Sequence, residues 1–176
     1  MVIRYEKCSN IIPEEVERLY RQPGATEYSP MSSIEEVRVA IDSISHAAAA
    51  GLCIVARDCD RLVGFIVLYP AFYTKFTHQA TFAVIVDFQC RGKGIGTSLV
   101  KQLLVESKKD LGIQSMRLEV YEHNPAYSIY KRLGFKEYGR HERFLIKKNE
   151  QGLKSEYTKI LMIKSLISET SEEIAQ

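Results

Sequence analysis

A glycine-rich turn near the middle of the chain, RGKGIGT at residues 91–97, constrains the fold more than any other feature. The residues before it, 80–86, are apolar on both faces, which predicts a central strand covered on both sides. The residues after it, 95–111, carry apolar side chains at helical spacing, which predicts a helix. A strand that turns on glycines into a helix presents the first N–H groups of that helix, and such groups attract phosphate.

The spacing of the glycines distinguishes among phosphate-binding loops. A Walker loop needs G-x-x-x-x-G-K-[ST], but here Lys93 is followed by glycine. A dinucleotide fingerprint needs G-x-G-x-x-G, whereas Gly92, Gly94 and Gly96 give G-x-G-x-G. The positive charges of Arg91 and Lys93 still favour a pyrophosphate. A turn that merely lets the helix pack tightly on the strand is the alternative that spacing leaves open.

Length and composition indicate one globular domain. The chain has 176 residues, 45% of them hydrophobic and 26% charged, with a net charge of +2. We expect a single domain over residues 1–167 and a polar, acidic tail over 168–176. The charge balance argues against nucleic acid as a partner, and the longest apolar runs are too short to cross a membrane. The start of the chain has no signal layout, so we expect a cytoplasmic protein.

The cysteines give no sign of a metal site. Cys8, Cys53, Cys59 and Cys90 are scattered, with no C-x-x-C pair and no histidine at metal spacing. We therefore expect no metal and four reduced thiols without a catalytic role. Cys90 stands beside the glycine turn, but ordinary packing is the better interpretation.

The remaining elements follow from caps, turns and alternation. Proline and acidic residues at 13–15 predict a short helix, and Ser32 or Ser33 with Glu35 or Glu36 predicts a capped one. The predicted elements are a strand at 2–7, helices at 13–20 and 33–49, a hairpin of strands 52–57 and 62–69, a strand at 116–121, a helix at 125–133 and an antiparallel pair at 135–146 and 156–166. This order predicts an α/β fold with a mixed sheet, antiparallel at its front and back.

Two segments resemble a known family. Arg91-x-x-Gly94-x-Gly96 after an apolar strand matches the R/Q-x-x-G-x-G/A signature of the GNAT superfamily of acyl-CoA-dependent N-acyltransferases. LEV at 118–120, NPA at 124–126 and IYKRLGF at 129–135 resemble its L-x-V, N-x-A and L-Y-x-x-x-G-F block. Phe88 stands where a proline is common, and Cys90 where an aromatic is usual. The resemblance covers residues 52–135 and implies the GNAT fold: a twisted, mostly antiparallel sheet of about seven strands with four helices and a splay between the fourth and fifth strands.

The resemblance implies acetyl-CoA as cosubstrate. The free backbone of the central strand would pair with the pantetheine arm and the acyl carbonyl, the glycine turn would cradle the pyrophosphate, and Asn124 would bind the pantetheine chain. The residues implied to bind the cofactor are Val84, Ile85, Val86, Arg91, Gly92, Lys93, Gly94, Ile95, Gly96, Thr97 and Asn124. An ordinary helix cap is the alternative role for Asn124.

The resemblance also implies an acid and a base. Tyr130 would protonate the departing thiolate, and the alternative is a core tyrosine beside Ile129 and Leu133. The segment resembles the subgroup that acetylates ribosomal-protein N-terminal amines, where Glu119 would be the base. The alternative for Glu119 is a carboxylate paired with Arg117 or a nearby lysine. The weaker candidates for the base are Glu122, His123 and Asp87, and a water chain could also carry the proton.

The resulting hypothesis is an N-acetyltransferase that moves an acetyl group from acetyl-CoA to a primary amine by direct attack. The amine could belong to a small molecule, such as an amino acid or polyamine, or to a peptide or protein N-terminus. We expect it between residues 22–30 and the final hairpin, near Tyr28, Tyr157 and Arg143. Lys131 and Arg132 either reach the 3′-phosphate or face water.

Two rival classes stay open at this point. One is a non-catalytic acyl-CoA-binding sensor, and the other is a protein that binds nucleotide phosphates. Acyl-chain length also stays open, as does the oligomeric state, for which a homodimer is one option.

Overall fold

The computed structural model describes residues 2–148 and 154–167. Its strands are β1 (Ile3–Lys7), β2 (Cys53–Asp58), β3 (Arg61–Pro70), β4 (Gln79–Val86), β5 (Ser115–Tyr121), β6 (Lys136–Lys148) and β7 (Lys154–Ser165). Its α-helices are α1 (Pro13–Tyr20), α2 (Ile34–Ala49), α3 (Ile95–Leu111) and α4 (Ala126–Arg132), with short 3₁₀ turns at Thr74–Phe76 and Phe88–Cys90. The element order is the one that the sequence predicts.

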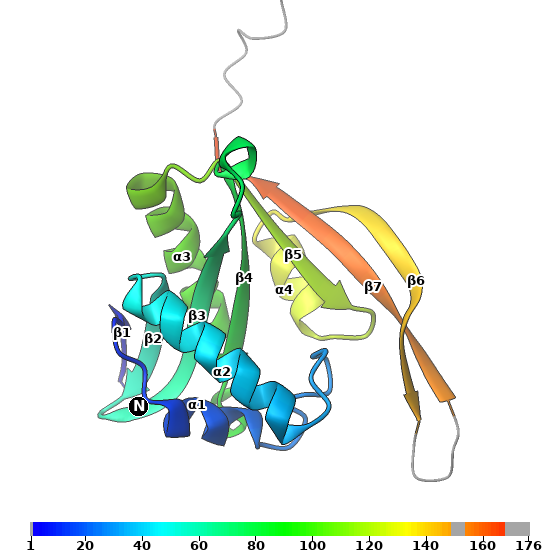
Figure 1. The fold of residues 1–176 in the computed structure, drawn as a ribbon, viewed down its shortest axis with the longest axis horizontal. Helices are drawn as coiled ribbons and strands as arrows, with labels where there is room; N and C mark the ends of the chain where they lie inside the picture. Colours follow the sequence, from blue (N-terminus) through cyan, green and yellow to red (C-terminus); the bar gives the residue numbers. More distant parts are fainter. Residues whose placement is uncertain (1, 149–153, 168–176) are drawn as a thin grey trace, which may run out of the picture.

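The strands form one mixed sheet in the order β1-β2-β3-β4-β5-β7-β6 (Figure 1). Every neighbouring pair is antiparallel except β4 and β5, which run parallel. Seven strands lie within the described residues, so the expected mostly antiparallel sheet is confirmed.

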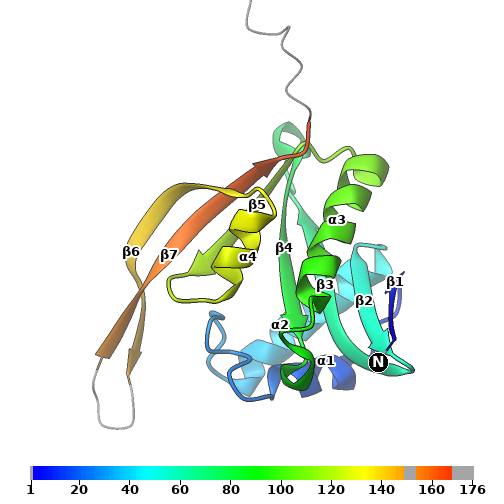
Figure 2. The ribbon, with the colours of Figure 1, turned by 180° about the vertical axis from the view of Figure 1, so that it is seen from behind.

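Strands β4 and β5 separate soon after they begin. They pair only at Gln79 with Ser115 and at Ala80 with Met116, and farther along they diverge (Figures 1 and 2). The second half of β4, which includes residues 84–86, therefore lacks a strand on its β5 side within the described chain. The predicted splay between the fourth and fifth strands is confirmed.

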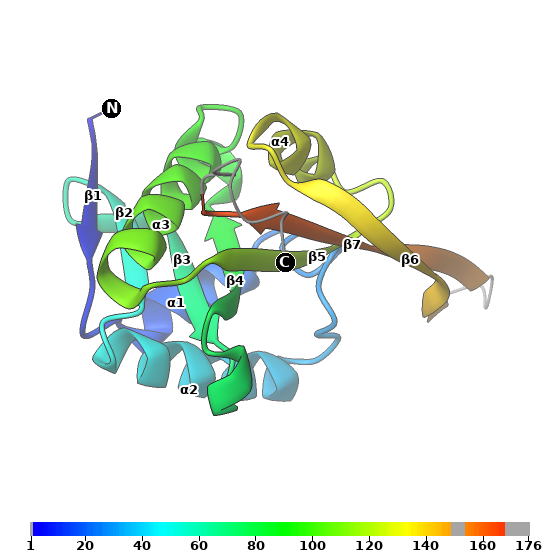
Figure 3. The same cartoon turned by 90° about the horizontal axis from the view of Figure 1, so that it is seen from above.

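Helices cover both faces of the sheet. Figure 3 shows α3 and α4 on one side and α1 and α2 on the other. One core packs Leu99 and Leu103 of α3 against the sheet, and a second packs Leu19 of α1 and Ile44 of α2 against its opposite face, where Phe65 is fully buried. Full burial of each such side chain contributes about 1.5–3 kcal/mol, so the two cores fix both ends of the turn at 87–94 that joins β4 to α3.

Three local expectations need correction. α4 is shorter than predicted: Pro125 is its N-cap rather than its first helical residue, and the helix ends at Arg132. The final strands are longer than predicted, reaching Lys148 and Lys154, and residues 149–153 of their connection lie outside the described residues, as does the tail at 168–176. Tyr121, on the predicted polar face of its strand, is buried because the Phe144 ring packs near it, with centroids 6.2 Å apart.

Candidate active site

A cavity of about 710 Å³ lies at the splay. Four parts of the chain form its walls: the segment between α1 and α2, the end of β4, the glycine turn with the start of α3, and α4 with the two residues before it. The lining residues are Gly24, Ala25, Glu27, Tyr28, Val84, Ile85, Val86, Cys90, Arg91, Gly92, Gly94, Ile95, Gly96, Thr97, Val100, Asn124, Pro125, Ala126, Ile129, Tyr130 and Arg132. All the predicted cofactor-binding residues except Lys93 are among them.

The glycine turn presents backbone N–H groups to this cavity. Gly92 (φ +74°) and Gly94 (φ +81°) adopt the left-handed conformation, and no heavy atom lies within 4 Å of the position that a Cβ would take at either one. The Ser98 N–H donates to the Gly94 carbonyl at 3.0 Å and closes the first turn of α3. The amides of residues 95–97 therefore lie at the open, electropositive end of a 17-residue helix.

Two arginines bring positive charge to the cavity. Arg91 donates through Nε to the Val86 carbonyl at 3.3 Å, and its guanidinium lies 5.5 Å from the centre of the Phe88 ring. Arg132 lines the cavity from the end of α4. Lys93 Nζ instead donates to the Gln89 carbonyl at 3.1 Å, on the backbone of its own loop.

The structure distinguishes Lys131 from Arg132, for both of which the sequence left open a contact with the 3′-phosphate or a position facing water. Lys131 is not among the residues that line the cavity, and its Nζ lies 5.6 Å from the centre of the Tyr127 ring. Arg132 is therefore the one of the two that is placed to meet a ligand.

Tyr130 lines the cavity from α4 and is also packed in the core. Its ring makes edge contacts with Phe82 and Phe135, each at 5.9 Å between centroids, and only 8% of the residue is exposed. Burial raises the pKa of its hydroxyl to about 12, so Tyr130 carries its proton throughout the neutral range. Core packing and contact with the cavity are compatible here.

Asn124 also contacts both the protein backbone and the cavity. Its Oδ1 accepts the Ala126 N–H at 2.9 Å at the start of α4, and the residue lines the cavity. Asn124 thus contacts the start of α4 from one position before the cap, since the N-cap of this helix is Pro125 and not Asn124 as expected.

Glu119 lies on β5 outside the residues that line the cavity. Its carboxylate accepts a hydrogen bond from Lys159 Nζ of β7 at 2.5 Å, and 59% of its side chain is exposed. Lys159 Nζ also lies 3.4 Å from the centre of the Phe144 ring. The structure thus gives Glu119 the lysine partner of the alternative interpretation, and the assignment of the base remains a prediction.

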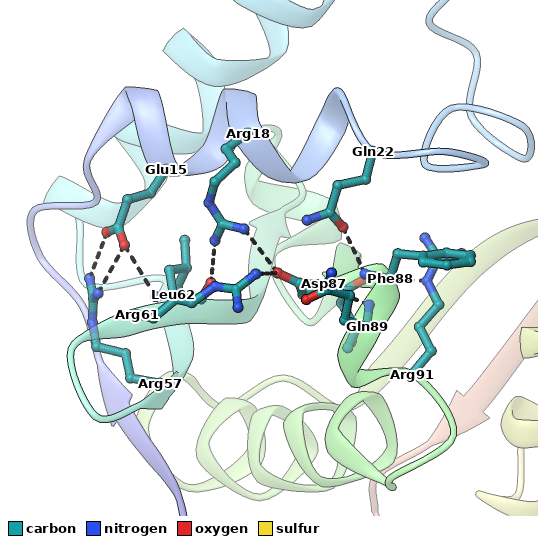
Figure 4. Close-up of polar contacts among 11 residues, drawn as sticks. Glu15, Arg18, Gln22, Arg57, Arg61, Leu62, Asp87, Phe88, Gln89 and Arg91 are labelled. Atoms are coloured by element: carbon teal, nitrogen blue, oxygen red, sulfur yellow. Dashed lines mark hydrogen bonds and ion pairs between the residues drawn. The ribbon is translucent and has the colours of Figure 1, made fainter. Parts of the chain in front are cut away.

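Asp87 does not fit the role of base. The side chain is completely buried and accepts hydrogen bonds from Arg18, Arg61 and the Gln89 N–H (Figure 4). Burial alone would raise the pKa of this carboxyl, but the bonds from Arg18, Gln22 and the Gln89 amide, with the charge of Arg61, hold the pKa below its ordinary value. Asp87 is therefore a buried, charged residue that holds the chain between the end of β4 and the glycine turn. Glu122, a second weak candidate, pairs with Arg140 at 3.5 Å.

The expected acceptor region is only partly assembled around the cavity. Tyr28 lines it, and burial, followed by the neighbouring Glu27 carboxylate, raises the pKa of the Tyr28 hydroxyl. Arg143 pairs with Glu156 at 2.9 Å on the final hairpin and is not a lining residue. Glu27 also lines the cavity and was not predicted, because a carboxylate beside Tyr28 is its only local signal.

Within residues 2–148 and 154–167 there is no group of three or more histidine, cysteine or acidic side chains that could hold a metal ion. The four cysteines are free thiols. None of the helices in this part of the chain is long and apolar enough to cross a membrane.

A family model described as the acetyltransferase (GNAT) domain matches residues 49–137. The match covers just over half of the chain and includes the splay, the glycine turn and α4. The chain belongs to this family.

Two curated relatives align with part of the chain. YwnH of Bacillus subtilis, which carries the provisional name phosphinothricin acetyltransferase, is 31% identical over 48% of this chain and 53% of its own length. The L-amino acid N-acetyltransferase AaaT of Escherichia coli is 23% identical over 51% of this chain and 56% of its own length. The chain thus spans about half the length of the curated relatives that it matches.

Solved structures share the fold over nearly the whole chain. The Escherichia coli ribosomal-protein-S18-alanine N-acetyltransferase has a TM-score of 0.72 at 16% identity, covering 97% of this chain and 98% of its own. The protein yncA of Salmonella typhimurium, a provisionally named acetyltransferase solved with its cofactor acetyl-CoA, has a TM-score of 0.72 at 13% identity and covers 99% of both chains. These likenesses confirm the predicted fold.

Proposed function

We propose that the protein is an N-acetyltransferase that moves an acetyl group from acetyl-CoA to a primary amine. The observation that carries the proposal is one cavity that joins the open N-terminal end of α3 to the buried hydroxyl-bearing ring of Tyr130. An extended anionic thioester needs an anion site at one end and an apolar site with a proton donor at the other. The family membership agrees with this chemistry.

The residues present fit acetyl-CoA. The amides at 92–97 and the charge of Arg91 suit a diphosphate, and Arg132 is available to a further phosphate. The unpaired side of β4 at residues 84–86 suits the amide groups of a pantetheine arm, with Asn124 on the facing wall. The cavity volume of about 710 Å³ falls in the range of small-molecule sites.

Direct attack of the amine on the thioester has three chemical requirements that the protein must meet. The amine must lose a proton, and at pH 7 this costs about 4.6 kcal/mol for an amine of pKa about 10.4 but only about 1.4 kcal/mol for an α-amine of pKa about 8. A fixed N–H must stabilise the oxyanion, and the free backbone of β4 can supply it. Finally, the departing thiolate must receive a proton, which Tyr130 holds.

A tyrosine of pKa about 12 is a weak acid toward an ordinary thiolate of pKa about 8.5. A buried thiolate is more basic than an exposed one, because burial penalises the charged form. Cys53 illustrates the effect in this chain, since burial raises the pKa of its thiol to about 12. A thiolate that departs inside the cavity is therefore a better proton acceptor for Tyr130 than an exposed thiolate.

The acid role of Tyr130 is tested by Tyr130→Phe, which removes the hydroxyl and keeps the ring packed. We expect kcat, followed by free thiol release from acetyl-CoA with a panel of amines, to fall at least about 100-fold. The Kd of acetyl-CoA, measured by calorimetry, should stay within about threefold of the wild type, because the anion site is untouched. Unchanged turnover would remove Tyr130 as the acid. Binding without turnover in the wild type would favour the sensor.

Glu119 is proposed as the base, acting directly or through water, with Lys159 as its ion-pair partner. Glu119→Gln should lower kcat about 100-fold, and Glu142→Gln on the exposed surface of β6 is the matched control. Thiol release that survives intact in Glu119→Gln would leave a water chain as the route for the proton.

We propose an α-amine as the acceptor, on an amino acid or at a peptide N-terminus. Its lower deprotonation cost favours it over a lysine-like amine. The names of AaaT and of the ribosomal-protein enzyme refer to amino-acid and alanine amines, which supports the same class of acceptor. Amino acids, polyamines and short peptides in the amine panel separate these acceptors.

A further inference from the structure

The glycine turn cannot be held in place by its own backbone amides. A diphosphate at the start of α3 would bind the amides of residues 95–97, so a hydrogen bond that fixed these amides internally would compete with it. The turn must therefore be positioned from its two ends. One end is the packed helix α3, and the other is the short 3₁₀ turn at Phe88–Cys90, which begins directly after Asp87.

Asp87 fixes that second end with both of its carboxylate oxygens (Figure 4). Oδ2 accepts from Arg18 Nη1 at 2.9 Å and from Arg61 Nη2 at 2.7 Å, and Oδ1 accepts from the Gln89 N–H at 3.0 Å. The Asp87 N–H donates to the Val63 carbonyl at 2.8 Å. The side chain thus ties the turn to α1, to β3 and to its own next residues at once.

Gln22 makes a second connection from the end of α1. Its Oε1 accepts the Phe88 N–H at 2.7 Å, although the two residues are 66 positions apart. Gln22 also begins the segment that leads to α2, in which Gly24, Ala25, Glu27 and Tyr28 line the same cavity as the glycine turn. Arg91 of the glycine turn also approaches this segment. Its Nη1 lies about 4.0 Å from the position that a Cβ would take at Gly24.

We propose that Asp87 and Gln22 are positioning residues that hold the glycine turn ready for the diphosphate and tie it to the opposite wall of the cavity. The inference rests on the proposed function, since it assigns these residues to the acetyl-CoA site. One wall binds the diphosphate and the other borders the acceptor region. Occupancy of the turn therefore steadies residues 22–33 through the Gln22–Phe88 bond, and the acceptor wall is ordered when acetyl-CoA is bound.

The test is hydrogen–deuterium exchange of the full chain with and without CoA, on wild type and Gln22→Ala. In the wild type we expect CoA to slow exchange at 92–97 and at 22–33. In Gln22→Ala protection should persist at 92–97 and be lost at 22–33, with the Kd of CoA raised about two- to tenfold for one lost hydrogen bond. Arg21→Ala, which loses only an exposed pair with Glu17, should behave as wild type.

The outcomes separate the two proposals. If CoA protects 92–97 in both proteins, and Gln22→Ala also keeps full protection at 22–33 and an unchanged Kd, only the positioning role is overturned. No protection at 92–97 in the wild type would overturn the proposed function and this inference with it. Asp87→Asn is the second variant: it keeps the shape but loses the charge, and its Kd should rise about tenfold. Thermal unfolding confirms that each variant is folded.

Discussion

The carboxylate of Asp87 keeps its charge although no part of the side chain reaches solvent. An isolated buried carboxylate would be protonated near neutral pH, and only the surrounding donors prevent this. Arg18 and Arg61 each keep part of their own side chains in water, with 37% and 52% exposed. Of these three charged groups, only the Asp87 carboxylate is fully desolvated. It lies a few residues before those proposed to bind a diphosphate.

The lowered pKa of Asp87 predicts an acid-sensitive contribution to stability. Because the native pKa lies below the unfolded value of about 4, the contribution is complete above about pH 4 and is lost as pH falls through the native pKa. Urea unfolding at pH 7 should find Asp87→Asn less stable than wild type by about 2 kcal/mol. At pH 2.5 the difference should be smaller. A difference that stayed constant with pH would show that the native pKa of this carboxyl equals the unfolded value, and so would contradict the lowered pKa.

Gly94 tests the glycine turn itself. Its φ of +81° is strained for any residue with a Cβ, although open space surrounds the position. Gly94→Ala should therefore disturb the backbone rather than fill the site, raising the Kd of acetyl-CoA about tenfold for roughly 1–2 kcal/mol of strain. Gly51→Ala, at φ +73° far from the cavity lining, controls for the general effect of such a change. Equal Kd values for Gly94→Ala and wild type would argue against the turn as the diphosphate site.

At the scale of single elements, local signals located most boundaries. Helix α1 begins at Pro13, and α3 runs from Ile95 to Leu111, as the sequence predicts, because proline, glycine and apolar spacing act within the segment itself. α4 was less well bounded, since Asn124 and Pro125 both satisfy the rules for a helix start. The ends of β6 and β7 depend on pairing with each other, which no local signal specifies.

Helix α2 offers a stability test that leaves the site alone. The Ser33 hydroxyl accepts the Glu36 N–H at 3.2 Å, and the Glu36 carboxylate accepts the Ser33 N–H at 3.1 Å. Ser33→Ala removes one half of this capping box and should lower the free energy of unfolding by about 1 kcal/mol. The Tm should fall by about 2–4 °C with the Kd of acetyl-CoA unchanged. An unchanged Tm would mean that solvent or Ser32 replaces the cap.

At the scale of the whole molecule, the site depends on contacts between distant segments. The positions of the glycine turn, Asn124 and Tyr130 on one cavity were predictable because each lies in a short local pattern. The partner of Glu119 was not, because Lys159 meets it only through the antiparallel pairing of β5 with β7. The contact of Gln22 with the backbone of Phe88 was hidden for the same reason, since α1 must first pack beside the end of β4.

The splay between β4 and β5 provides the space for the cavity around which these contacts are arranged. A continuous sheet would pair the backbone of residues 84–86 and close the space that the cavity occupies. The two strands share only two paired positions before they diverge. Helices on both faces then hold the two halves of the sheet, so the opening is part of the packed structure (Figure 3).

The most direct measurement is a calorimetric titration of the wild-type chain with acetyl-CoA and, separately, with ATP. Saturable heat from acetyl-CoA at one site per chain, with none from ATP at the same concentrations, is the result expected for a cavity shaped for a phosphopantetheine thioester. Absence of heat with acetyl-CoA, or equal binding of ATP, would contradict this assignment and leave the splayed strands without the ligand proposed for them.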